Sequence, residues 1–110
     1  MRSLRIDFVD FWPNFKKNDN YFYHLLNSRY SVSIDEADPD LVFFSVDYSK
    51  SNQRHKYTNH RSRKIFYTGE NVSPNLNFPG SMEYPRYSIG KSDFSFSFED
   101  NQDPRNYRFP

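Results

Sequence analysis

One acidic residue stands among amides and hydroxyls in a short loop of this sequence, a pattern suited to sugar chemistry. Glu70 follows Gly69, which permits a tight exit from the apolar segment before it. A carboxylate can take a proton from a hydroxyl group, and amide and hydroxyl side chains can orient that group. The polar neighbours available here are Asn71, Ser73 and Asn75. The alternative interpretation is a solvated loop in which Glu70 caps the next turn, since most loop residues carry no function.

A second candidate loop is aromatic. Trp12 and Asn14 follow the first apolar segment, and Tyr67 lies at the end of the segment that precedes Gly69. Aromatic rings are apolar bodies that can stack on the apolar faces of sugars, and an asparagine amide can bond to a sugar hydroxyl. The other interpretation is that Trp12 packs on the first helix and that Asn14 is a turn residue.

Both loops follow segments with the periodicity of strands. Residues 4–10 and 30–34 alternate apolar and polar side chains, and residues 93–99 alternate strictly, as half-buried strands do. Residues 41–46 are continuously apolar, which is typical of a strand buried on both faces in a parallel sheet. Residues 64–68 are predicted as a further strand.

A helix is predicted between the first two strands. Its cap is expected at 18–20, and apolar residues then recur at helical spacing from Tyr21 to Leu26. The order strand, helix, strand, strand, strand predicts a three-layer α/β domain with a mostly parallel sheet. Ligands of such sheets bind at the carboxyl ends of the strands, which is where both candidate loops lie.

Length and composition exclude several classes of protein. The chain has 110 residues, which suits a single domain over 1–110. Its net charge of +1 argues against a nucleic-acid partner, and the lack of cysteine excludes disulfides and thiolate metal sites. No apolar run approaches the ~20 residues of a transmembrane helix, so a cytoplasmic protein, or a trimmed piece of a membrane-associated one, is expected. Aromatics make up 20% and must supply much of the core, mainly Phe8, Phe22, Phe43, Phe44, Phe66, Phe94, Phe96 and Phe98.

A basic segment over residues 50–64 offers a competing function. Its cations and nearby tyrosines could contact phosphates and stack on bases, as in a small RNA-binding module. The favoured interpretation is a solvated connecting segment that could form an exposed helix, because acidic residues elsewhere cancel its charge. His55 and His60 lie in it without a nearby acidic residue, so a metal site is not expected.

The loop that contains Glu70 also carries a recognisable sequence motif. The stretch from Tyr67 to Asn75 closely resembles the signature of the α-1,3/4-fucosyltransferases of glycosyltransferase family 10. The chain is similar to the family's flanking elements over 6–13, 19–30, 38–45, 93–99 and 103–110. Members have a GT-B fold of two Rossmann-like domains. The resemblance therefore implies the N-terminal, acceptor-side domain, with the donor-binding C-terminal domain absent.

The resemblance implies a chemistry as well. The intact enzyme would transfer L-fucose from GDP-fucose, with inversion, to a hydroxyl of GlcNAc or glucose in an oligosaccharide, without a metal or a further cofactor. Glu70 stands where the general base sits, and this fragment alone would be inactive. Val72 departs from members that carry a second acidic residue there, and residues 79–91 look like an insertion. The implied acceptor-binding residues are Trp12, Asn14, Tyr67, Asn71, Ser73 and Asn75. The rival function is a non-catalytic glycan-binding or regulatory domain of the same fold.

Overall fold

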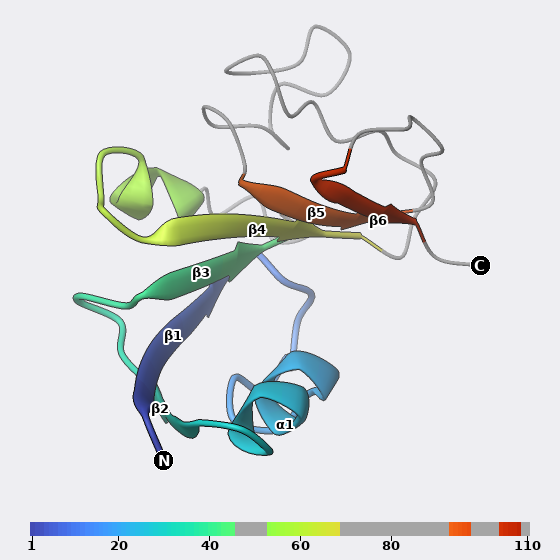
Figure 1. Cartoon of the computed structure of the whole chain (residues 1–110). Coiled ribbons are helices and arrows are strands. Elements are labelled where there is room, and N and C mark those ends of the chain that lie inside the picture. The colour runs from blue at the N-terminus through green and yellow to red at the C-terminus, as the bar shows by residue number, and fades with distance from the viewer. Residues whose placement is uncertain (46–52, 69–92, 98–103, 109–110) are drawn as a thin grey trace, which may run out of the picture.

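A parallel sheet forms the centre of the domain. The computed structural model describes residues 1–45, 53–68, 93–97 and 104–108. Six strands in this part form one sheet in the order β2-β1-β3-β4-β5-β6, and every neighbouring pair is parallel (Figure 1). The strands are β1 (Ser3–Val9), β2 (Ser31–Ile34), β3 (Leu41–Phe44), β4 (Arg63–Tyr67), β5 (Phe94–Ser97) and β6 (Asn106–Arg108). The predicted α/β fold is confirmed and is consistent with a Rossmann-like domain.

The strand order has a switch point between β1 and β3. The chain leaves β1, forms the helix α1 (Tyr21–Asn27) and returns as β2 on one side of β1, whereas β3 pairs with the other side. Val9 lies opposite Phe44 at the carboxyl ends of these two strands. Ligands of open parallel sheets bind in the crevice outside such a point, so the geometry directs attention to this edge.

The two faces of the sheet have different covers. α1 lies on one side of the sheet and the short 3-10 helix η1 (Gln53–Tyr57) lies on the other (Figure 1). Side chains alternate along β1, so its buried residues divide between the two faces. On the α1 side the buried cluster is Ile6, Phe8, Phe11, Phe22 and Phe43, and on the η1 side it is Val9, Val42, Phe44, Tyr57 and Phe66.

The helix α1 begins at a side-chain cap. The Asn20 side chain accepts a hydrogen bond from the backbone amide of Tyr23 at 3.0 Å, and its own amide donates to the carbonyls of Lys16 and Lys17. The cap satisfies one of the free amides of the first turn. It lies within the predicted range 18–20. No helix in the described part is long and apolar enough to cross a membrane.

The structure corrects three predictions. No strand was predicted after residue 99, but β6 lies there; it was missed because its pairing with β5 stabilises a stretch of low apolar content. The basic segment is not simply a solvated connection, because η1 buries Arg54 and Tyr57 in it. Phe94 was predicted in the core, but it is 50% exposed because the described residues leave that part of β5 partly uncovered. Phe98 lies outside the described residues.

Candidate functional site

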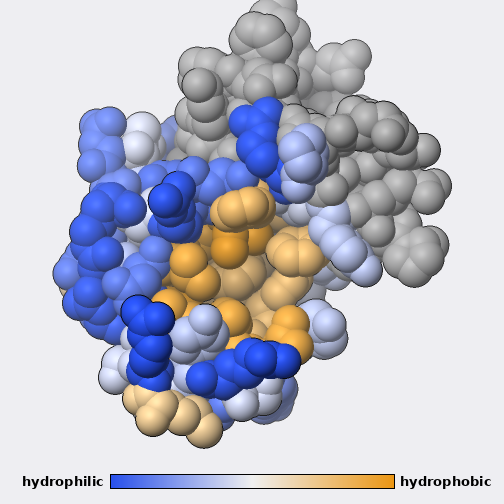
Figure 2. Space-filling model, viewed as in Figure 1, coloured by the Kyte–Doolittle hydropathy of each residue, from blue (hydrophilic) through white to orange (hydrophobic). Residues whose placement is uncertain are grey.

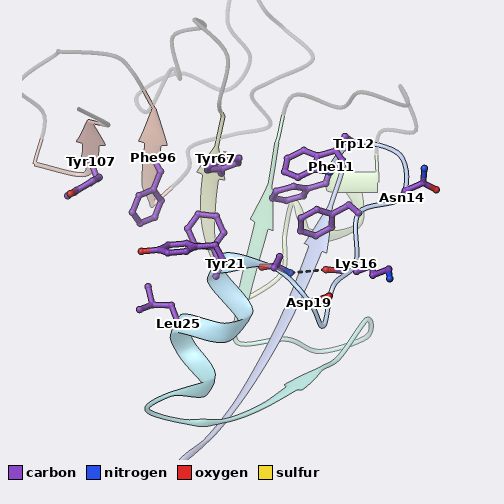
Figure 3. A pocket seen from close by; sticks show the side chains of 13 residues that line it. Phe11, Trp12, Asn14, Lys16, Asp19, Tyr21, Leu25, Tyr67, Phe96 and Tyr107 are labelled. Atoms are coloured by element: carbon purple, nitrogen blue, oxygen red, sulfur yellow. Dashed lines mark hydrogen bonds between the residues drawn. The ribbon is translucent and has the colours of Figure 1, made fainter.

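An aromatic groove lies between α1 and the ends of strands β4, β5 and β6. Its cavity volume is about 760 Å³. Figure 2 shows apolar side chains gathered in the middle of this side of the molecule, with hydrophilic residues around them. The residues that line the groove are Phe11, Trp12, Asn14, Phe15, Lys16, Asp19, Asn20, Tyr21, Phe22, Leu25, Tyr67, Phe96 and Tyr107 (Figure 3).

A tight turn after β1 builds the first wall of the groove. The backbone amide of Phe15 donates to the carbonyl of Trp12 at 3.2 Å. Pro13 at the second position and Asn14 at the third, with a φ of 67°, fit a type II turn. Phe11 stacks on Phe15 with ring centroids 4.2 Å apart, and Trp12 meets Phe15 edge-on at 5.0 Å. The positive φ that this turn requires therefore favours an asparagine at position 14, which also lines the groove.

Three neighbouring strands build the opposite wall. Tyr67 of β4 pairs in register with Phe96 of β5, which pairs with Tyr107 of β6. Residues in register on adjacent parallel strands point to the same face, so the three side chains form a row that faces α1 (Figure 3). Phe22 of α1 closes the floor, because its ring centroid lies 5.3 Å from those of both Tyr67 and Phe96.

The rim of the groove carries exposed side chains, both apolar and polar. Tyr21 and Leu25 stand four residues apart on α1, so they share one helix face at the opening. The Asp19 Oδ1 lies 2.8 Å from the His24 Nε2, at hydrogen-bond distance. This bond holds the pKa of the Asp19 carboxyl below its usual value. An apolar floor with a few polar groups at its edge is the usual composition of a small-molecule site.

Buried polar groups lie in β1 and directly after it, outside the lining of the groove. Asp7 of β1 accepts hydrogen bonds from Lys17 at 2.7 Å and from the Tyr57 hydroxyl at 2.5 Å. Burial, together with the bond to Asp7, raises the pKa of Tyr57. Asp10 directly follows β1 and pairs with Arg54 at 2.7 Å. Burial alone would raise the pKa of Asp10, but its hydrogen bonds from Arg54 and Gln53 outweigh that effect and lower it.

A comparison with protein families decides the assignment. The family model described as "Alpha-(1,3)-fucosyltransferase FucT N-terminal domain" matches residues 6–110. The chain belongs to this family. It is thus the N-terminal region of a fucosyltransferase, which is a glycosyltransferase. No curated protein and no solved structure gives a significant match.

The fucosyltransferase domain brings three predicted site residues together. Trp12 and Asn14 come from the loop after β1, and Tyr67 comes from the end of β4, yet all three line the aromatic groove. The other predicted residues lie outside the described residues: the proposed base Glu70, and Asn71, Ser73 and Asn75. Val72 and residues 79–91 lie outside them as well. The acceptor-binding and catalytic roles therefore stay predictions.

Sequence reasoning missed most of the groove in this domain. Phe96 was expected to be core, and Tyr107 lies in β6, where no strand was predicted. Tyr21 and Leu25 were recognised as helical, but their common face was not recognised as a rim. A usable signal was the aromatic content of 20%, which exceeds what the predicted core positions absorb. Aromatic side chains in excess of the core have to lie at a surface, and a binding groove is one such place.

Proposed function

We propose that this chain is the acceptor-side N-terminal domain of an inverting α-1,3-fucosyltransferase of glycosyltransferase family 10. The intact enzyme transfers L-fucose from GDP-fucose to a hydroxyl group of an oligosaccharide, and a separate C-terminal domain binds the donor. The observation that carries the proposal is the joining of Trp12 and Tyr67 in one aromatic groove, within a chain that matches the family over residues 6–110.

The composition of the groove supports a sugar as its ligand. A pyranose has faces of C–H groups, which pack well on flat apolar rings, and edges of hydroxyl groups, which need hydrogen-bond partners. The groove offers both kinds of surface: rings from Trp12, Tyr67 and Phe96, and polar side chains from Asn14 and Asp19. Its volume of about 760 Å³ lies in the ordinary range of ligand pockets and can hold more than one sugar ring.

The residue proposed as the base, Glu70, follows closely in sequence after a residue that lines the groove. Tyr67 ends β4 and lines the groove, and Glu70 follows three positions later. In the proposed reaction the Glu70 carboxylate takes the proton of the acceptor hydroxyl. The hydroxyl oxygen bonds to the anomeric carbon of fucose from the face opposite to the donor phosphate. The bond from that carbon to GDP breaks, so GDP leaves with the electron pair and the configuration inverts.

A pair of substitutions in the enzyme that contains this domain tests the proposal. Glu70→Gln should lower kcat by about 10²–10⁴-fold with a nearly unchanged KM for GDP-fucose, because the amide cannot accept the proton. Trp12→Ala should raise the KM for the acceptor and leave that for GDP-fucose in place. Phe94→Ala is a matched control, since Phe94 is a half-exposed aromatic that does not line the groove.

The two substitutions test the catalytic base and the acceptor site separately. An unchanged kcat in Glu70→Gln would remove Glu70 as the base, and an unchanged acceptor KM in Trp12→Ala would remove the groove as the acceptor site. The chain by itself is expected not to consume GDP-fucose. Glycan binding that depends on Trp12, in a protein whose complete form shows no transfer, would favour the non-catalytic glycan-binding domain instead.

A further inference from the structure

The buried ion pair between Asp10 and Arg54 joins two distant parts of the chain. The Arg54 Nε donates to Asp10 Oδ2 at 2.7 Å, and the backbone amides of Gln53 and Arg54 donate to the same carboxylate at 2.8 and 2.9 Å. The side chains of Asp10 and Arg54 are 0% and 1% exposed. A buried charge persists only with partners of this kind, so Asp10 is held firmly to η1.

The other end of the Arg54 guanidinium reaches the neighbouring strand. Its Nη2 donates to the carbonyl of Ser45, the residue that follows β3. Its central carbon lies 5.2 Å from the centre of the Phe44 ring. Arg54 therefore connects the carboxyl ends of β1 and β3 at the switch point of the sheet. Two bonds in different directions require the planar fork of an arginine, which a lysine does not have.

Asp10 has an unusual backbone that leads directly into the groove. Its φ is 60°, in the left-handed region that a residue with a Cβ atom enters only at a cost. Such a conformation persists where the surrounding contacts determine it. The next residues are Phe11 and Trp12, whose rings contact each other at 5.5 Å and line the groove. The direction in which the chain leaves Asp10 therefore sets where Trp12 stands.

We propose that Arg54 is a positioning residue for the aromatic groove: by holding Asp10 in its left-handed conformation, it fixes Trp12 at the groove wall. The consequence for an acceptor sugar rests on the proposed function, but the placement of Trp12 does not. Arg54 belongs to the basic segment over residues 50–64, and this proposal gives it a structural role that needs no contact with a polyanion. It acts on the groove from the opposite face of the sheet.

The sequence supplies a direct reporter for this proposal. Trp12 is the only tryptophan in the 110 residues, so the intrinsic tryptophan fluorescence of the chain reports on this loop alone. We would compare Arg54→Lys with Tyr57→Phe under native conditions. Both substitutions weaken buried bonds made by η1, but Tyr57 bonds to Asp7 and not to Asp10. Urea titration and circular dichroism would establish that each variant is folded.

The expected result is a change confined to the arginine variant. Arg54→Lys should shift the Trp12 emission maximum and raise its quenching by acrylamide, whereas Tyr57→Phe should lose stability without either change. An unchanged spectrum and quenching constant in Arg54→Lys would overturn the proposal. So would equal changes in both variants, because they would indicate general loosening. If Arg54→Lys does not fold, Asp10→Asn is measured by the same criteria, since asparagine tolerates a positive φ but lacks the charge.

A sugar titration separates this proposal from the proposed function. Disaccharides that contain GlcNAc or glucose would be added to the unchanged chain and to Arg54→Lys, with Trp12 fluorescence as the signal. Weaker binding to Arg54→Lys is expected. If the unchanged chain binds no sugar while Arg54→Lys still shows the spectral change, the acceptor role of the groove fails and the positioning role of Arg54 stands.

Discussion

The two faces of the sheet are stabilised in different ways. On the α1 side, aromatic rings pack on one another: Phe8 stacks on Phe43 with centroids 4.9 Å apart, and Phe22 stacks on Phe43 at the same distance. On the η1 side, buried polar groups make directional bonds, such as those of Asp10 with Arg54. Ring packing tolerates an open groove at its edge, whereas directional bonds hold a loop in one conformation. The fold therefore places the aromatic groove on one face and the buried ion pair of Asp10 with Arg54 on the other.

The largest effect should come from removing a ring at the centre of the α1 side. Phe8 is 2% exposed and touches the rings of Phe11, Phe15 and Phe43. Phe8→Ala should lower the free energy of unfolding by about 3–5 kcal/mol, through lost burial and the cavity that remains. Urea unfolding followed by circular dichroism measures this loss. A loss below about 1 kcal/mol, the size of a surface effect, would mean that the aromatic cluster does not carry this face.

A smaller effect is expected from acid, which should destabilise the η1 side of the sheet more than the α1 side. The pKa of Asp10 is lower in the folded chain than in the unfolded chain, so ionised Asp10 stabilises the fold. That contribution is complete above the ordinary pKa of about 4 and is lost as the pH falls through the lowered value. Amide hydrogen exchange at pH 3 and pH 6, corrected for intrinsic rates, should therefore show less protection in η1 at pH 3. Protection in α1 should change less, and equal losses in both helices would contradict the comparison.

The smallest effect on stability is expected at the rim of the groove. Tyr21 is 72% exposed and lies at the start of α1. Tyr21→Ser should change the free energy of unfolding by no more than about 0.5 kcal/mol, as surface substitutions usually do. If the groove binds a sugar, the same variant should bind the disaccharide more weakly, which isothermal titration calorimetry can measure. A large loss of stability would show that Tyr21 belongs to the core of this face and not to its rim.

Most strands could be predicted from the sequence, because their signals are local. The alternation in residues 4–10 and the apolar run from Leu41 to Val46 depend only on neighbours along the chain. β6 could not be predicted in this way, since its three residues form a strand only through pairing with β5. The burial of the η1 side chains was missed for a similar reason. Arg54 looks like a solvated cation in the sequence, and its burial depends on Asp10, 44 positions away.

The sequence predicted the residues that the loops and strand ends contribute to the candidate site, but not the residues of β5 and β6 that line it. Trp12, Asn14 and Tyr67 were found because each follows or ends a strand, and the topology brings strand ends together. Phe96 and Tyr107 were not found, because their place in the groove depends on the register of β4, β5 and β6. Register is set by cross-strand contacts, which periodicity in one segment does not reveal.

The all-parallel pairing described above also bears on how the chain reaches its native state. Antiparallel neighbours can form as hairpins, but parallel neighbours require a crossover, so the pairs β1–β2, β1–β3, β3–β4 and β4–β5 join residues that are distant in sequence. Closing those connections costs chain entropy before the strand pairs form and stabilise the fold. Folding is therefore slow in chains whose contacts join distant residues. β5 and β6 lie near each other in sequence and can pair early, whereas β4 must find β5 across a long stretch of chain. A slow search for this β4–β5 contact follows from the same sheet that aligns Tyr67, Phe96 and Tyr107.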